Sequence, residues 1–350
     1  MSKPVATLSA SNVFQRISVL GAGAWGTALA LNAARAGRDV VLWGRNAESL
    51  DSISTKRQLP AYLPGITFDQ PLETTTDITE AADADCILLV APAQMTASIA
   101  ETIGLYVRKG TPVVLAAKGL EKGTQRMMSE VLADYLPQAT PAILSGPSFA
   151  ADVARGLPTA VTIATPSAPL ADKLCATLSS QSFRPYASTD MIGVQLGGAL
   201  KNILAIACGI VLGKQLGASA HAALMTRGFA EMQRLALKLG ARSDTLMGLS
   251  GFGDVALSCS NHQSRNFAFG FALGEGKALS DLMAPGAKLS EGAYSARVAC
   301  ELANAHGVEL PVAQAVADVL EQKDSIDEAV TKLMSRPLRA ESEVPSKPNS

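Results

Sequence analysis

Residues 16–45 read RISVLGAGAWGTALALNAARAGRDVVLWGR and decide the fold of the first half of the chain. A β-rich run at 16–20 leads through a glycine turn into a helical run, and a second β-rich run follows at 39–43. Gly21, Gly23 and Gly26 fill the pattern G-x-G-x-x-G, whose glycines permit a tight turn, backbone approach to a pyrophosphate and close helix packing, in that order. The phosphates would lie at the helix N-terminus, where free N–H groups and the dipole favour negative charge. The pattern therefore predicts a dinucleotide site; the alternative is a glycine turn in another kind of α/β protein.

The end of the second β-rich run bears on the choice of dinucleotide. A site built only for NAD should place an acidic residue there, about 20 positions after the glycines, to bind the ribose 2′-hydroxyl. The sequence instead reads Trp43-Gly44-Arg45. Because an arginine would pair with a 2′-phosphate, we expect the cofactor to be NADP or NAD, with NADP accepted. The alternative is that Arg45 is a solvated surface residue.

The chain changes character once, near residue 189. Before that point β-rich runs at 86–90, 112–117, 141–145 and 159–165 alternate with helical runs, and 182–188 is a candidate last strand. Such alternation is typical of βαβ units and a parallel sheet covered on both faces, whereas the apolar spacing after Asp190 is helical. We predict an α/β fold, with a Rossmann NAD(P)-binding domain at 13–189 and an all-helical substrate-binding domain at 190–335. We expect residues 1–12 to be a loose leader and residues 336–350 a disordered tail.

Composition excludes several classes of protein and site. The 350 residues are 48% apolar, which is enough to build two cores, and 30 Lys and Arg balance 31 Asp and Glu. Without a basic stripe we expect no nucleic-acid partner. Five widely spaced cysteines and three histidines lack disulfide or metal spacing, so we expect no metal and a cytoplasmic protein. The N-terminus has no apolar segment of the kind found in signal peptides.

The stretch LGGALKNILAIACGIVLG at 196–213 is apolar apart from Lys201 and Asn202. Its length reaches the lower limit for a membrane span, but it holds several glycines and a lysine that insertion scales penalise by roughly 3 kcal/mol. We therefore predict a buried helix and no transmembrane segment. Gly193 and Gly197 share the helical face of Lys201, so a ligand or another backbone could come close to that face.

Three loops at the carboxyl ends of predicted strands hold candidate site residues, because ligands of open α/β sheets bind there. Pro92 follows the run at 86–90, and Lys118 follows the run at 112–117, where its ammonium could meet a substrate phosphate or hydroxyl. Gly146-Pro147-Ser148 forms a rigid turn that allows close backbone approach. The alternative for Lys118, as for Lys201, is a lysine that snorkels to the surface.

A second group of candidates lies in the helical half. Asp254 follows a glycine-rich turn, and Ser264-Arg265-Asn266 precedes an apolar helical run. Arg265 beside a helix N-terminus could bind a phosphate with bidentate geometry. The alternative is a helix cap followed by a surface arginine.

Together these motifs resemble those of bacterial NAD(P)-dependent glycerol-3-phosphate dehydrogenases. GAGAWGT, AAKGL, SGPSFA, GVQLGGALKN, MTRGFAEM and G-x-G-D-x-x-x-x-C-x-x-x-x-S-R-N occur in the family's order between about residues 16 and 330. The resemblance implies a Rossmann domain followed by a helical domain. It also implies interconversion of sn-glycerol 3-phosphate and dihydroxyacetone phosphate, which supplies glycerol 3-phosphate for phospholipid synthesis. We accordingly expect a phosphorylated small-molecule substrate and a homodimer.

The resemblance also implies roles for individual residues. Lys201 matches the family's proton acceptor, and Asn202 beside it belongs to the same site. The positions that match substrate contacts are Lys118, Gly146, Ser148, Asp254, Ser264, Arg265 and Asn266. The positions that match cofactor contacts, beside Gly21, Gly23 and Gly26, are Ala24, Trp25, Arg45, Lys118, Ala150, Arg265, Leu289 and Glu291.

The sequence departs from the family pattern in a few places. Ala24 is commonly Ser, residues 261–263 vary, and Phe267-Ala268 stands where many members have two basic residues, which removes positive charge near the substrate end. Two other functions stay open. A hydroxy-acid or ketopantoate-type dehydrogenase also uses a lysine but binds a carboxylate, and a non-catalytic dinucleotide sensor would need no lysine in the cleft.

Overall fold

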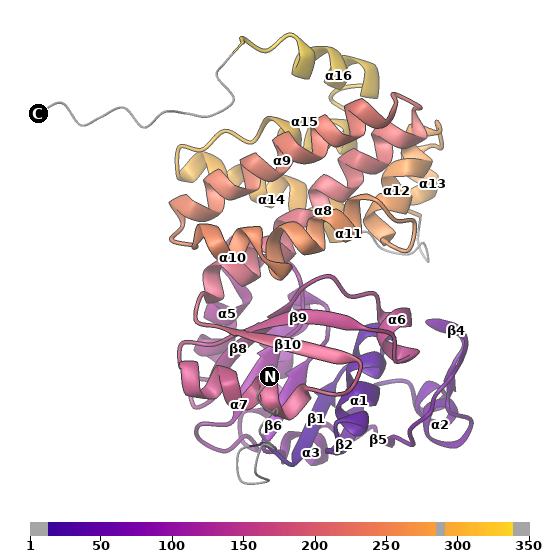
Figure 1. Cartoon of the computed structure of the whole chain (residues 1–350), viewed down its shortest axis with the longest axis vertical. Helices are drawn as coiled ribbons and strands as arrows, with labels where there is room; N and C mark the ends of the chain where they lie inside the picture. The colour runs from indigo at the N-terminus through magenta and orange to yellow at the C-terminus, as the bar shows by residue number, and fades with distance from the viewer. Residues whose placement is uncertain (1–12, 285–290, 339–350) are drawn as a thin grey trace, which may run out of the picture.

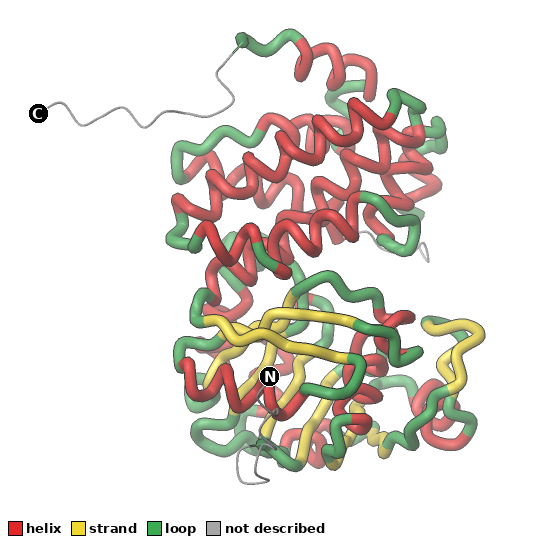
Figure 2. The backbone as a smooth tube through the Cα atoms, viewed as in Figure 1, coloured by secondary structure: helices red, strands yellow, loops and turns green. Residues whose placement is uncertain are grey.

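The chain folds into two lobes, shown in Figure 1. The computed structural model describes residues 13–284 and 291–338. Figure 2 shows that the strands gather in one lobe, here called the sheet lobe, and that the other, the helical lobe, contains helices and loops. The predicted Rossmann fold followed by an all-helical half is confirmed. The predicted leader and Leu289 lie outside the described residues, as does the predicted tail from residue 339 onward.

The sheet lobe is built on eight strands. They are β1 (Arg16–Leu20), β2 (Asp39–Trp43), β5 (Glu73–Thr75), β6 (Cys86–Leu89), β7 (Pro112–Leu115), β8 (Thr140–Ser145), β9 (Thr159–Ala164) and β10 (Phe183–Ser188). Their order across the sheet is β10-β9-β8-β7-β6-β1-β2-β5. The strand order therefore reverses between β1 and β6, which is where open α/β sheets bind nucleotides.

Helices cover both faces of the sheet. They are α1 (Ala24–Arg35), α2 (Ala47–Thr55), α3 (Ile78–Ala82), η2 (Ala93–Met95), α4 (Thr96–Ile103), α5 (Met128–Tyr135), α6 (Ala150–Ala154) and α7 (Ala168–Leu178). Alternate side chains of β1 point to opposite faces, with Ile17 and Val19 in one core and Leu20 in the other. A small hairpin, β3 (Gln58–Leu59) and β4 (Leu63–Thr67), follows α2 and was not predicted.

The expectation of a wholly parallel sheet is wrong at β9, which pairs antiparallel with β8. A parallel crossover must carry the chain back along the full length of the sheet. The only helix between β8 and β9 is α6, whose five residues rise roughly 8 Å, too little to run beside a six-residue strand. The 11-residue helix α7 is long enough, and β10 accordingly runs parallel to β9.

The helical lobe is arranged around one long buried helix, α8 (Met191–Gly213). The others are α9 (Ala218–Lys238), α10 (Ser243–Met247), η3 (Leu249–Gly253), α11 (Asp254–Cys259), α12 (Arg265–Gly274), α13 (Leu279–Leu282), α14 (Glu291–Ala305), α15 (Pro311–Leu320) and α16 (Ile326–Met334). Within the described residues α8 alone is long and apolar enough to cross a membrane, but 89% of its most apolar window is buried inside the protein. Its apolar faces are therefore covered by the protein's own helices.

Glycines let α8 and α12 approach backbone to backbone. Added methyl groups on Gly209 and Gly213 would press on the backbone of α12, and methyl groups on Gly270 and Gly274 would press on the backbone of α8. Because neither helix carries a side chain at these points, their axes are held closer than ordinary side chains allow. This contact fixes the start of α12 relative to α8.

Candidate active site between the two lobes

The glycine turn after β1 has the three features that a pyrophosphate site requires. Gly21 adopts a φ of +130°, which favours glycine, and a methyl group on Gly26 would overlap the carbonyl of Gly21. A methyl group on Gly23, by contrast, would meet no atom within 4 Å. The first and third glycines are thus needed for the fold, and the second leaves open space in front of α1, which begins at Ala24. A dinucleotide phosphate fits this arrangement, with Trp25 beside it in the first turn of the helix.

Arg45 lies just past the end of β2 and is exposed. Within the described part of the chain its side chain makes no hydrogen bond or ion pair. The position is the one at which a second strand meets the adenosine ribose in a Rossmann site. The structure therefore leaves both predictions open, a 2′-phosphate partner and a surface arginine.

The centre of the candidate site is a cluster of two lysines that share one carboxylate. Asp254 accepts a hydrogen bond from Lys118 Nζ at 2.7 Å through one oxygen, and it pairs with Lys201 Nζ through the other. Only 1% of the Asp254 side chain and 8% of the Lys201 side chain are exposed. Lys118 comes from the sheet lobe and the other two from the helical lobe, so the cluster joins the lobes. Sequence reasoning named all three, and the structure brings them together.

The glycines of α8 explain how the cluster is assembled. A methyl group on Gly197 would overlap the carbonyl of Ser250 in the π-helical turn η3, which leads directly into Asp254. A methyl group on Gly198 would lie 2.8 Å from Ser145 Oγ and 3.6 Å from Cγ of Lys118. Of the two expectations for this helical face, close approach of another backbone is therefore the one observed. These glycines admit the elements that carry Asp254 and Lys118.

Burial and charge shift the pKa values of the cluster. Burial lowers the pKa of Lys201 from 10.5 to about 7; Asp254 opposes the shift and Lys118 adds to it. Burial alone would raise the pKa of Asp254, but the two ammonium groups hold it below its ordinary value. One carboxylate cannot compensate two buried ammonium groups, so the more deeply buried Lys201 is the group that releases a proton near neutral pH.

Two further residues complete the surroundings of Lys201. Ser258, one turn after Asp254 on α11, accepts a hydrogen bond from Lys201 Nζ at 2.9 Å and is buried. Sequence reasoning missed Ser258, although its spacing of four from Asp254 places both on one helical face. Asn202 is 6% exposed, and its side chain makes no hydrogen bond with the described residues.

The loop after β8 faces the helical lobe. Gly146 has a φ of +148° and is packed so closely on Val161 that a methyl group would lie 2.9 Å from its Cα. Ser148 is half-buried and donates a hydrogen bond to the carbonyl of Gly146 at 3.0 Å, and Ala150 begins α6. The close packing holds the turn at the carboxyl edge of the sheet, where it was predicted.

The start of α12 places the predicted phosphate-binding residues. Ser264 is the N-cap, and its hydroxyl accepts a hydrogen bond from the N–H of Phe267. Asn266 is buried, and its Oδ1 accepts a hydrogen bond from Gly292 N at 3.0 Å, near the start of α14 at Glu291. Arg265 is exposed between them. Its guanidinium makes no hydrogen bond or ion pair with the lysine cluster, so the structure places Arg265 at the helix N-terminus but does not join it to Lys201.

Phe267 belongs to the core. It is 1% exposed, and its ring lies 5.0 Å from that of His262 and 6.3 Å from that of Phe271. The replacement of a basic pair at 267–268 therefore leaves only the half-buried Ala268 near the surface beside Arg265.

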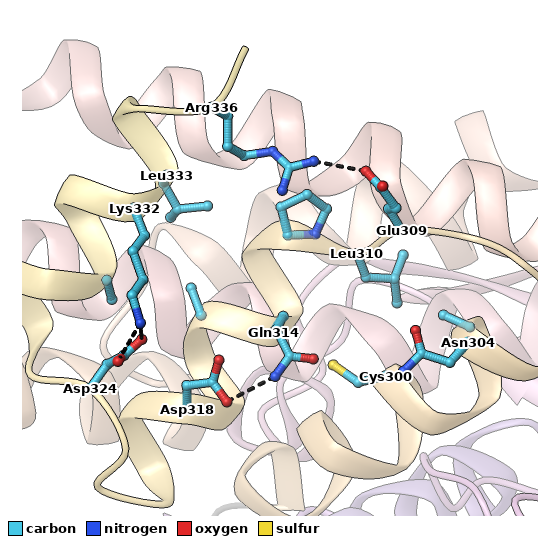
Figure 3. Close-up of a pocket in the computed structure, with 14 residues that line it drawn as sticks. Cys300, Asn304, Glu309, Leu310, Gln314, Asp318, Asp324, Lys332, Leu333 and Arg336 are labelled. Atoms are coloured by element: carbon cyan, nitrogen blue, oxygen red, sulfur yellow. Dashed lines mark hydrogen bonds and ion pairs between the residues drawn. The ribbon is translucent and has the colours of Figure 1, made fainter.

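A cavity of about 300 Å³ lies elsewhere, among α14, α15 and α16 (Figure 3). Four of its charged side chains form two ion pairs, Lys332 with Asp324 at 2.6 Å and Arg336 with Glu309 at 2.8 Å. It contains none of the cluster residues. We therefore assign it no part in the chemistry at Lys201.

Comparison with known proteins identifies what this arrangement is similar to. Residues 16–171 match the family model of the NAD-dependent glycerol-3-phosphate dehydrogenase N-terminus, and residues 190–331 match that of the C-terminus. A glycerol-3-phosphate dehydrogenase (NAD(P)+) of Bradyrhizobium sp. is 56% identical over 94% of this chain and 99% of its own length. The crystal structure of a glycerol-3-phosphate dehydrogenase from Coxiella burnetii superposes with a TM-score of 0.86 at 39% identity, covering 92% of this chain and 99% of that one. A ketopantoate reductase from Ralstonia eutropha, 17% identical with a TM-score of 0.55 over 90% of this chain and all of its own, shares the fold alone.

Proposed function

Since the chain belongs to the NAD-dependent glycerol-3-phosphate dehydrogenase family, we propose that it interconverts sn-glycerol 3-phosphate and dihydroxyacetone phosphate, with Lys201 as the proton-transfer residue. The observation that carries the proposal is the buried lysine whose pKa lies near 7, paired with Asp254 and facing Lys118 across the lobes. The product of reduction would supply the glycerol backbone of phospholipids. A ketopantoate-type or hydroxy-acid reaction is not favoured, because relatives over 50% identical are named for glycerol 3-phosphate.

Lys201 is placed to act as both base and acid. As a free amine it takes the proton of the C2 hydroxyl when glycerol 3-phosphate is oxidised, and as an ammonium it returns the proton when dihydroxyacetone phosphate is reduced. A pKa of about 7 keeps both forms abundant at neutral pH, which an ordinary lysine does not. NAD or NADP held at the edge of the sheet would supply the hydride chemistry at C2.

The neighbours of Lys201 hold it in position and tune its charge. Asp254 and Ser258 fix the amine from one side, and Lys118 contributes a second positive charge that meets the oxygen of the substrate. Asn202, which follows Lys201 on α8, would supply a carboxamide for a substrate hydroxyl. Gly146 and Ser148 border the same edge of the sheet. Holding two ligands between the lobes is itself a large part of such catalysis.

The phosphate of the substrate would bind at the start of α12. The helix N-terminus offers backbone N–H groups and the positive end of the dipole, and Arg265 adds a planar guanidinium. Ser264 and Asn266 are occupied in shaping this helix start, and so support the phosphate site.

NAD or NADP would occupy the edge of the sheet from the glycine turn to Arg45. Gly21, Gly23, Ala24, Trp25 and Gly26 would form the pyrophosphate contact, and Ala150, Leu289 and Glu291, with Lys118 and Arg265, are the further cofactor positions proposed. The open space at Gly23 supports this assignment. We divide the chain into a cofactor domain at 13–189 and a substrate domain at 190–335, which agrees with the change from β10 to α8.

One assay tests the function and two variants test the roles. We expect NADPH or NADH oxidation with dihydroxyacetone phosphate and none with ketopantoate; the reverse preference would overturn the proposal. Lys201→Ala should abolish turnover while cofactor affinity, measured by fluorescence titration, is retained. Arg265→Ala should mainly raise KM for the phosphorylated substrate. Near-normal turnover of the first variant, or an unchanged KM of the second, would contradict the assigned role.

We also propose that the protein is a homodimer, as the family resemblance implies, and that it is cytoplasmic, as its cysteine usage indicates. All five cysteines are unpaired, which agrees with a reducing compartment. Sedimentation velocity tests the first statement, since a monomer-sized species at micromolar concentration would refute it. Cell fractionation tests the second.

A further inference from the structure

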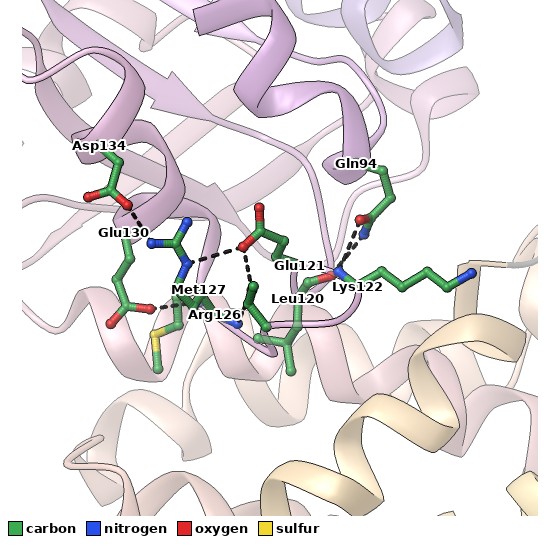
Figure 4. Close-up of polar contacts among 9 residues, drawn as sticks. Gln94, Leu120, Glu121, Lys122, Arg126, Met127, Glu130 and Asp134 are labelled. Atoms are coloured by element: carbon green, nitrogen blue, oxygen red, sulfur yellow. Dashed lines mark hydrogen bonds and ion pairs between the residues drawn. The ribbon is translucent and has the colours of Figure 1, made fainter.

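Lys118 is carried by a hairpin-like loop, residues 118–127, which Figure 4 shows in close-up. Leu120 and Met127 form an antiparallel bridge at its base, and the N–H of Glu121 donates to the carbonyl of Arg126 at 2.9 Å. The side chain of Glu121 accepts hydrogen bonds from Thr124 and Arg126 across the turn. The loop is therefore a folded unit that can transmit a displacement to Lys118.

The loop belongs to the sheet lobe in sequence but packs in the helical lobe. Leu120 is 7% exposed and lies in the apolar core that α8 organises. Gln125 donates a hydrogen bond to Glu301 of α14 at 3.1 Å. Because burial of an apolar side chain stabilises its position, Leu120 is an anchor of the loop in the helical lobe.

One side chain of the sheet lobe holds the opposite edge of this loop. The carboxamide of Gln94, in η2, donates to the carbonyl of Leu120 at 2.9 Å and accepts from the N–H of Lys122 at 3.0 Å. It thus pairs with the loop backbone on both sides of Glu121, as a neighbouring strand would. Gln94 follows β6, beside the point at which the strand order reverses.

We propose that Gln94 is a positioning residue that sets the place of the Lys118 ammonium in the active site through its paired hydrogen bonds to the loop. The inference rests on the role given to Lys118 in the proposed function. Gly119, with a φ of +153°, lies between Lys118 and the residues that Gln94 holds. Glycine resists rotation least, so a loop released at Leu120 and Lys122 can turn at Gly119 and carry Lys118 away from Asp254.

A displaced Lys118 has a consequence that mere loss of stability does not produce. Burial and the ammonium of Lys118 lower the pKa of Lys201, and the carboxylate of Asp254 raises it. The other polar groups near its amine are the hydroxyl of Ser258 and the thiol of Cys259. Moving the ammonium of Lys118 away relieves part of the lowering. The pH at which glycerol 3-phosphate oxidation rises should therefore move upward.

The test compares four variants of the whole enzyme, three at glutamines and one at Lys118. Gln94→Met keeps the size of the side chain and removes both hydrogen bonds, whereas Gln94→Glu keeps the acceptor for Lys122 N–H. Gln138→Met is the matched control, because Gln138 also donates to a backbone carbonyl, that of Gly104 at 2.6 Å, and this bond lies outside the loop of residues 118–127. Lys118→Met reports the effect of losing the ammonium itself. The readouts are kcat/KM for glycerol 3-phosphate against pH and the melting temperature.

We expect Gln94→Met to lower kcat/KM about fivefold and Gln94→Glu to lower it less. In both variants, as in Lys118→Met, the rising limb of the pH profile, which is the range over which kcat/KM for glycerol 3-phosphate increases with pH, should move to higher pH. If Gln94→Met behaves like Gln138→Met, or loses activity without moving the limb, the inference is overturned while the proposed function stands. If Lys118→Met itself matches the wild type in rate and in pH profile, the role of Lys118 is wrong and the inference falls with it.

Discussion

Gly270→Ala tests whether the contact between α8 and α12 sets the geometry of the site. A methyl group at Gly270 would lie 2.1 Å from the carbonyl oxygen and 2.8 Å from the carbonyl carbon of Ile206 in α8. Carbon and oxygen atoms approach to roughly 3.3 Å, so the helices must separate by about 1 Å. Such overpacking costs about 1–3 kcal/mol, offset in part by the better helix propensity of alanine.

The separation should act on catalysis more than on stability. α8 carries Lys201 and α12 begins at Arg265, so moving one helix changes the distance between the base and the proposed phosphate site. A misplacement of about 1 Å can cost about a hundredfold in rate. We expect kcat/KM for dihydroxyacetone phosphate to fall between about tenfold and a hundredfold, measured by NADPH oxidation with thermal unfolding alongside.

The control for Gly270→Ala is Gly104→Ala. Gly104 also lies at a helical φ, and a methyl group there would meet its nearest atom, Glu101 O, at 3.3 Å. This variant should keep wild-type activity. If Gly270→Ala keeps kcat/KM within about threefold of the wild type, the α8–α12 contact does not set the geometry of the site, whatever happens to stability.

Three further predictions address charge. Lys201 must be a free amine to accept the proton when glycerol 3-phosphate is oxidised, so the rate of oxidation should rise as the pH passes about 7 and the rate of the reverse reaction should fall. Rates that stay constant from about pH 6 to 9 would contradict the assignment. Arg45→Ala should raise KM for NADPH about tenfold and leave KM for NADH unchanged, whereas a strong NADH preference in both proteins would remove Arg45 from the site. Glu231 accepts hydrogen bonds from Val312 N–H, and burial raises the pKa of its carboxyl group from 4.5 to about 7. Between pH 4.5 and about pH 7 the folded state therefore keeps a proton that the unfolded state has lost. The free energy of unfolding accordingly falls as the pH rises through this range. Glu231→Gln should remove this pH dependence, which amounts to at most about 3 kcal/mol of unfolding free energy. The variant should therefore have a higher melting temperature than the wild type at pH 8 but not at pH 5. The same difference in melting temperature at both pH values would refute the prediction.

Local sequence patterns predicted the helices, the strands and the glycine turn, since glycine spacing and apolar periodicity depend only on residues that are close in the sequence. Gly21, Gly23 and Gly26 lie as the pattern requires, and α8 is the buried helix that its composition indicates. Lys118 and Asp254 were named separately, but the hydrogen bond between them joins residues 136 positions apart in the chain. The periodicity of apolar residues along the sequence does not predict such a contact.

The remaining differences have the same physical origin. The direction of β9 follows from the length of α6, which the sequence shows only as a short apolar stretch. Gly197 serves backbone packing against Ser250, although sequence alone allowed a ligand there equally well. Gln94 carries no motif, and its two bonds to the loop of Lys118 appear only when the loops after β6 and β7 are placed side by side.

The shared carboxylate of Asp254 also bears on how this enzyme can be recombined. A chimaera joined after β10 would take nearly all of each large core from one parent, because apart from Leu120 the buried residues of each core come from a single lobe. The cluster around Asp254 would instead be divided between the parents, because Lys118 would come from one and Lys201 with Asp254 from the other. Leu120 would likewise have to fit a pocket made by the other parent. Such hybrids should therefore fold far more often than they turn over substrate.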